Sequence, residues 1–173
     1  MCEMGKKTGI TIEDKLKNMG LVLPEPLKKP AGVKLPFAMV RVLGNIAYIS
    51  GHGPQNPDGS LAEPLGKVPT EVSIEEAYTA ARQTGLSILA SLKRELGELD
   101  RIGNWLKVLG MVNCTPEFNQ HPQVINGFSD LILELYGPEK GLHARSAVGM
   151  AGLPFNIPVE IEAIIEVIEK QVG

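Results

Sequence analysis

The stretch SIEEAYTAARQTGLSILASLKRELG, residues 73–97, decides the fold. Ser73 and Glu76 form a capping box, in which each side chain can satisfy a free backbone amide at the start of a helix. Apolar residues then recur at helical spacing as far as Gly97, which is typical of a helix end. The stretch therefore predicts a long helix with one buried face.

Strand-like runs and a second helix surround this helix. The strand-like runs are residues 38–43, 46–50, 105–114, 144–151 and 158–168, and the second amphipathic helix is residues 122–137. Gly44-Asn45 lies between the first two strands and suits a tight hairpin turn. The order β-β-α-β-α-β-β predicts an α+β domain whose two helices cover one face of a sheet. The other face remains uncovered, and we expect self-association to bury it.

Upstream of the hairpin, the sequence predicts a short helix and an extended arm. Residues 11–19 have helical apolar spacing, with Thr11 as the cap and Gly20 as the stop. Residues 21–36 contain four prolines, which keep the chain extended. We therefore divide the chain into a helix and arm, residues 1–35, and a main domain, residues 36–173.

A long loop follows the hairpin. Residues 51–70 are rich in Gly, Pro, Asn, Asp and Ser. A loop of this length in a compact domain is usually functional or disordered. We expect it to form a wall of a ligand site.

Composition and charge exclude several classes of protein. No segment approaches the roughly 20 apolar residues that span a membrane, and the chain start lacks the apolar run of a secretory signal peptide, so we expect a cytoplasmic protein with no membrane partner. The net charge is −3 and no basic cluster occurs, which argues against nucleic acid as a partner. Cys2 and Cys114 have neither metal spacing nor a disulfide framework, and we expect both to be reduced.

Familiar cofactor and nucleophile motifs do not occur in the sequence. It has no phosphate loop, dinucleotide fingerprint, zinc spacing or nucleophile elbow, and we expect neither a metal nor an organic cofactor. His52, His121 and His143 fall in predicted loops or at element ends, where histidine more often makes hydrogen bonds than catalyses. The histidines do not identify the chemistry.

Arg145 is the most informative polar residue. It lies at the start of a predicted strand, among small and apolar residues. An arginine in such a place either pairs with a protein carboxylate or binds an external one, and its planar guanidinium suits bidentate binding of a carboxylate. A small carboxylate-bearing ligand is therefore a candidate partner.

Several segments together resemble a known family. They are Ile49-Ser50-Gly51, Asn126, Ala144-Arg145-Ser146-Ala147-Val148, Leu153-Pro154 and Val159-Glu160-Ile161-Glu162-Ala163-Ile164. In order and approximate spacing they resemble the RidA family of imine deaminases, also called the YjgF family, over residues 36–167. The resemblance implies a chorismate mutase-like fold, with a mixed sheet, assembled as a homotrimer that has a ligand cleft at each subunit boundary.

The resemblance also implies roles for individual residues. An arginine in the place of Arg145 grips the carboxylate of a 2-imino acid such as 2-iminopropanoate. Ser50 and the amide of Gly51 line the same cleft, and Asn126 matches a polar helix residue near it. Glu160 matches the acidic residue that positions or activates water, so that ammonia leaves and a 2-keto acid remains.

Some positions depart from the family pattern. Phe37 replaces a tyrosine that precedes the first strand, which removes a hydroxyl donor, and Ala147 replaces a cysteine two residues after the arginine. If that cysteine contributes its backbone carbonyl, Ala147 can substitute for it; if the thiol matters, activity falls. His52 and His143 also stand where glutamine and proline are common. The chain resembles a side branch whose preferred ligand differs.

The sequence thus predicts hydrolytic deamination of small 2-imino or enamino acids. The substrate-binding residues would be Arg145, Ser50, Gly51, Asn126, Phe37 and Ala147, with Glu160 and Arg145 catalytic. One alternative is a non-catalytic trimer that binds small carboxylic acids. A second is an endoribonuclease or translation inhibitor, which the charge balance supports poorly.

Overall fold

The structure, a computed structural model, describes residues 9–29 and 31–169 of the chain. Cys2 and Pro30 lie outside the described residues, as do the other residues of the segment 1–8. The helices are α1 (Ile12–Asn18), α2 (Ile74–Leu96) and α3 (His121–Gly141), with short 3-10 turns at Leu99–Arg101 and Pro154–Asn156. The strands are β1 (Val40–Leu43), β2 (Ile46–His52), β3 (Ile102–Asn113), β4 (Ala144–Met150) and β5 (Val159–Val167). After α1, the predicted order β-β-α-β-α-β-β is confirmed.

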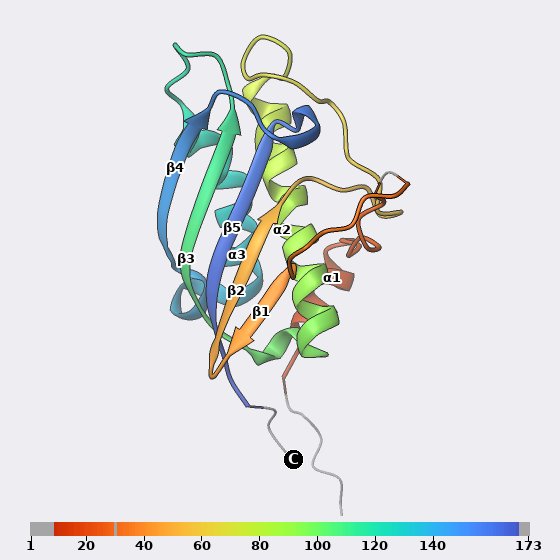
Figure 1. Ribbon diagram of the computed structural model, residues 1–173. Helices are drawn as coiled ribbons and strands as arrows, with labels where there is room; N and C mark the ends of the chain where they lie inside the picture. The colour runs from red at the N-terminus through yellow and green to blue at the C-terminus, as the bar shows by residue number, and fades with distance from the viewer. Residues whose placement is uncertain (1–8, 30, 170–173) are drawn as a thin grey trace, which may run out of the picture.

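The strands form one mixed sheet in the order β1-β2-β5-β3-β4. β3 and β4 are parallel, whereas the other neighbouring strands are antiparallel. Figure 1 shows α2 and α3 lying against the same face of this sheet. β5, the last strand of the chain, therefore lies in the centre, and β4 forms one edge.

The two long helices begin and pack largely as predicted. Ser73 and Glu76 complete the capping box of α2, and Gly97 ends the helix with a φ of 85°. A side chain at Gly127 of α3 would collide with the main-chain carbonyl of Tyr78, so the absence of a side chain allows the two helices to approach closely. α3 extends past its predicted end: its regular geometry breaks at Gly137, where φ is 70°, and the chain then makes another helical turn to Gly141. The break at Gly137 was predicted, and the turn after it was not.

The N-terminal helix belongs to the same core. Thr11 and Asp14 cap α1 reciprocally, and Ile12 and Leu16 are buried in the main hydrophobic cluster. The proline-containing arm then runs beside β1 and the loop that follows β2 (Figure 1). Residues of this segment therefore help to shape the domain surface near β1.

The sheet face opposite the helices carries exposed apolar side chains. Tyr48 of β2 is 49% exposed, and Val148 and Met150 of the edge strand β4 are 39% and 37% exposed. These exposed side chains confirm the predicted uncovered face of the sheet.

Among the described residues, none of the helices has the length and apolar character that a membrane span requires.

Candidate functional site

Arg145 is held by neutral oxygen atoms of α3. Its Nη1 donates to Asn126 Oδ1 at 2.9 Å and to Ser129 Oγ at 3.0 Å, and its Nη2 donates to the carbonyl of Pro122 at 3.4 Å. A guanidinium has five N–H groups. Two of them, on Nε and Nη2, therefore make no hydrogen bond within residues 9–29 and 31–169.

The charge of Arg145 is not neutralised by an ion pair in the described part of the chain. Burial lowers the pKa of the guanidinium below its usual value, and Asp130 acts in the opposite direction. A partly desolvated cation with free N–H groups binds an external carboxylate well, because charge-assisted bidentate contacts are strong.

His143 supports Arg145 through Ser129. His143 Nδ1 lies 2.7 Å from the carbonyl of Gly141 and must donate to it, which makes Nε2 the acceptor from Ser129 Oγ at 3.0 Å. The serine oxygen then accepts from Arg145. Burial lowers the pKa of His143, which favours this neutral form, and the nearby Arg145 adds to the shift.

Glu160 forms a second polar centre. It is half-buried on β5, and its carboxyl group lies directly over the backbone of Gly51, where the Cβ atom of any other residue would displace it. Burial raises the pKa of Glu160 above its usual 4.5, and the neighbouring Glu162 adds to the rise. The glycine thus makes room for a carboxylate that is a stronger base than an ordinary exposed glutamate.

A cavity of about 600 Å³ adjoins this second centre. Glu160, Gly51 and Phe37 line it, and Phe37 is 54% exposed. Ser50 does not line the cavity: its Oγ donates to the carbonyl of Ala38 at 2.7 Å, which fixes the chain before β1. The predicted residues Phe37, Ser50, Gly51 and Glu160 are therefore close together.

The structure of a single chain divides the predicted site residues into two groups. Val108 of β3 pairs with Arg145 on one side and with Ala163 on the other, whereas Glu160 pairs with Met111. Arg145 therefore lies two strand spacings across the sheet and three residues along the strand from Glu160. These offsets correspond to roughly 14 Å between the two Cα atoms.

The two groups also face opposite sides of the sheet. Arg145 points toward α3, whereas Glu160 alternates with buried Val159 and Ile161 and points away from the helices. Asn126 and Ala147 lie with Arg145, and Ala147 packs against the hydrophobic core. We name these two groups the arginine half-site (Asn126, Arg145, Ala147) and the glutamate half-site (Phe37, Ser50, Gly51, Glu160).

Sequence reasoning missed Ser129 as a supporting residue, whereas it expected His52 to make hydrogen bonds rather than to catalyse. Ser129 was not singled out, although its position three residues after Asn126 places both on one face of a helix.

His52 is buried, with Nδ1 2.6 Å from the carbonyl of Ser50 and Nε2 2.9 Å from Ser91 Oγ. Burial lowers the pKa of His52 to about 4. His52 is thus a neutral structural residue beside the cavity.

The fold and the polar centres define the class of protein, and comparisons with known proteins agree. The family model described as "YjgF/chorismate mutase-like, putative endoribonuclease" matches residues 13–165, so the chain belongs to this family. Protein TCP17 of Trypanosoma cruzi is 36% identical over 143 residues, which cover 78% of this chain and 88% of that protein.

Solved structures show the same relationship. Atu1372 of Agrobacterium tumefaciens, a protein of unknown function, is 39% identical with a TM-score of 0.79, and the match covers 91% of this chain and 92% of that one. A protein of Shewanella oneidensis described as a "putative endoribonuclease" is 30% identical with a TM-score of 0.81, over 91% and 99% of the two chains. The YjgF gene product of Escherichia coli, 22% identical with a TM-score of 0.57, shares the fold.

Proposed function

We propose that the chain hydrolyses 2-imino acids in clefts between the subunits of a homotrimer. The observation that carries this proposal is the guanidinium of Arg145, which is held by three neutral oxygens and retains two N–H groups for an external carboxylate. A structural arginine would be expected to pair with a protein carboxylate instead.

The separation of the two half-sites supports a shared cleft. Arg145 lies on the edge strand β4, and Glu160 lies on the opposite sheet face toward the β1 side. A rotated copy of the chain can bring the arginine half-site of one subunit to the glutamate half-site of the next. Closed cyclic symmetry gives every subunit the same contact, and the exposed apolar sheet face supplies a surface to bury.

The chemistry needs an anchor and a base. Arg145 binds the substrate carboxylate, and Glu160 accepts a proton from the water that attacks the imine carbon. A C–O bond forms, the C=N electron pair moves to nitrogen, and nitrogen takes up protons. The C–N bond then breaks, so that the imino acid and water yield a 2-keto acid and ammonia. The raised pKa of Glu160 favours its role as the base.

Two other functions give different results in the same experiment. A non-catalytic binder of small carboxylic acids would use the arginine half-site alone. This function follows if catalysis requires the tyrosine hydroxyl and the cysteine thiol, which Phe37 and Ala147 lack. An endoribonuclease is supported by the descriptions of relatives, while the net charge of −3 argues against a phosphate-binding surface.

The test is turnover of an imino acid generated in situ by an amino-acid oxidase. We expect the purified protein to release the 2-keto acid faster than the spontaneous hydrolysis rate. Binding of 2-keto acids without any acceleration would refute the deaminase and leave the binder. Cleavage of RNA that is abolished by Glu160→Gln would favour the endoribonuclease.

A further inference from the structure

The cavity beside Glu160 extends well beyond the polar centre. It passes around the edge of β2 at Gly51 and His52, where β1 no longer pairs with β2, and reaches Ser91 and Arg94 of α2. Its volume of about 600 Å³ lies within the range of pockets that hold drug-sized ligands, roughly 300–1,000 Å³. A three-carbon imino acid would leave most of this space empty.

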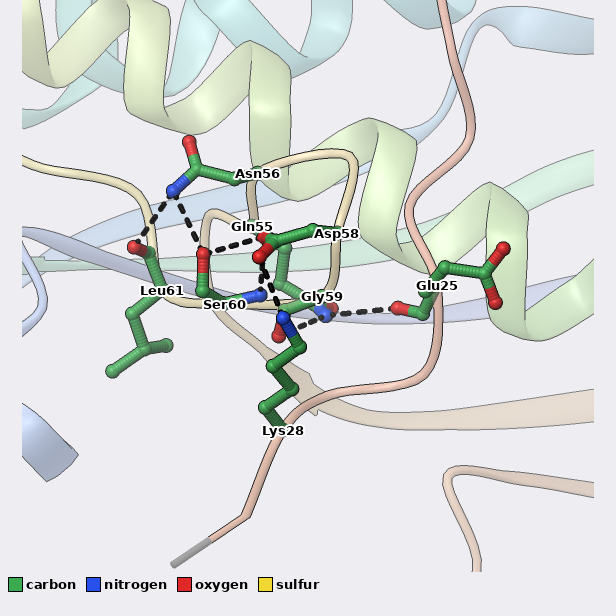
Figure 2. Close-up of polar contacts among 8 residues, drawn as sticks. All are labelled: Glu25, Lys28, Gln55, Asn56, Asp58, Gly59, Ser60 and Leu61. Atoms are coloured by element: carbon green, nitrogen blue, oxygen red, sulfur yellow. Dashed lines mark hydrogen bonds and ion pairs between the residues drawn. The ribbon is translucent and has the colours of Figure 1, made fainter.

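The arm forms one wall of the cavity through Pro26, Leu27 and Leu35. Figure 2 shows the polar contacts between this wall and the loop that follows β2. The backbone amides of Glu25 and Lys28 donate to the carbonyls of Pro57 and Gly59, at 3.0 Å and 2.9 Å.

Side chains reinforce this attachment. Gln55 Nε2 donates to the carbonyls of Glu25 and Gly59, and Lys28 forms an ion pair with Asp58 at 2.6 Å (Figure 2). A side chain at Gly59 would collide with the carbonyl of Pro26. The wall is therefore pre-formed by the fold.

Phe155 forms another wall of the cavity. Its ring is 57% exposed, and both Phe155 and Asn156 have left-handed backbone conformations, with φ of 56° and 57°. Such conformations cost energy in residues other than glycine and persist only where other contacts hold them. Asn113 Nδ2 donates to Asn156 Oδ1 at 3.0 Å, and the amide of Gly66 donates to the Asn156 carbonyl at 2.8 Å. These bonds hold an exposed aromatic ring at the cavity.

Key polar groups that line the cavity already have protein partners. Both ring nitrogens of His52 are engaged, Ser91 Oγ contacts His52 and accepts from Arg94, and Gln55 Nε2 binds two carbonyls. These groups offer little to a polar ligand, and the charged Lys29, Arg94 and Glu95, which also line the cavity, are exposed to solvent. Apolar side chains supply much of the remaining wall, and a ligand gains most there by burying apolar surface.

We propose that this cavity receives a large apolar substituent of the substrate, so that the preferred ligands are 2-imino acids with branched aliphatic or aromatic side chains. This inference rests on the proposed function, in which Arg145 of one subunit and Glu160 of the next place the carboxylate and the imine carbon at the cavity mouth. Phe155 and the arm then determine which side chains are accepted.

The test is calorimetric titration of the purified, assembled protein with pyruvate and with 4-methyl-2-oxopentanoate. Each buried methylene is worth about a fourfold gain in affinity, so the isobutyl side chain should bind about 50-fold more tightly than the methyl group. Phenylpyruvate should also bind more tightly than pyruvate. Equal affinity for the large and small keto acids would overturn the proposal.

Two variants locate the source of the selectivity. Phe155→Ala removes an apolar wall and should lower the ratio of the two affinities about tenfold, and Ala38→Trp should lower it by filling the space. Ile10→Ala is the matched control, because Ile10 is 67% exposed and lies outside the cavity lining, and it should leave the ratio unchanged. A ratio that neither cavity variant alters would contradict the assignment.

The outcome also separates this inference from the proposed function. If Arg145→Ala leaves the affinity of both keto acids unchanged, the carboxylate anchor is wrong and the proposed function fails. If Arg145→Ala weakens both ligands equally but side-chain size has no effect, the anchor stands and the cavity assignment fails.

Discussion

Replacing Arg145 by alanine should weaken the binding of every 2-keto acid by roughly the same factor. The wild-type guanidinium retains two N–H groups beyond its bonds to Asn126, Ser129 and Pro122. Each charge-assisted hydrogen bond to a carboxylate contributes about 1.5–3 kcal/mol, and partial replacement by water reduces the sum. We expect a loss of about 2–4 kcal/mol, which is roughly 30- to 1,000-fold in affinity and in kcat/KM.

Titration calorimetry with 2-oxobutanoate measures the affinity, and the coupled oxidase assay measures kcat/KM. Arg145→Lys is the matched variant: it keeps the charge but loses the planar pair of donors, so it should restore only part of the affinity. Thermal unfolding and light scattering establish that the variants remain folded and assembled. An Arg145→Ala protein that is folded, assembled and unchanged in affinity would refute the carboxylate anchor.

Three further predictions concern the base, the support of Arg145 and the helix contact. Glu160→Gln should keep keto-acid affinity but lower kcat about 100-fold or more in the oxidase assay. Because the pKa of Glu160 is raised and its ionised form is the base, wild-type kcat/KM should fall with decreasing pH at a midpoint above 4.5, and a midpoint at or below 4.5 would argue against this base. Ser129→Ala removes one acceptor of Arg145 and should weaken keto-acid binding by about 1 kcal/mol, whereas equal affinity would show that the serine is dispensable. Gly127→Ala should lower the free energy of unfolding by about 1–3 kcal/mol in urea denaturation, because the methyl group meets the Tyr78 carbonyl; an unchanged midpoint would show that the helices can separate at no cost.

Local sequence signals were sufficient for the elements of the fold. The capping box at Ser73 and the cap at Thr11 each depend on residues within three positions of one another, and the turn at Gly44 depends on adjacent residues. Such patterns can be interpreted without knowledge of the tertiary structure. The extra turn after Gly137 was missed because a glycine followed by Pro138 is also typical of a complete helix end.

The strand order and the shape of the site could be predicted only in part. The residue types at Arg145 and Glu160 were informative, but the placement of β5 between β2 and β3 is a long-range property. It determines that two strand spacings separate the two residues, whereas the alternation of side chains along each strand determines that they face opposite sides of the sheet. The cavity under the arm was also inaccessible to sequence reasoning, because it depends on backbone hydrogen bonds between Glu25, Lys28 and a distant loop.

A mixing experiment tests the shared cleft most directly. Arg145→Ala and Glu160→Gln subunits are each expected to form assemblies with little turnover, since each lacks one half-site in every cleft. After the two proteins are dissociated, mixed in equal amounts and reassembled, random assortment should give about a quarter of the clefts an intact Arg145 from one subunit and an intact Glu160 from another. The account predicts recovery of about a quarter of the wild-type imine hydrolysis rate. No recovery from mixed assemblies, confirmed as mixed by mass spectrometry, would contradict a site built by two subunits.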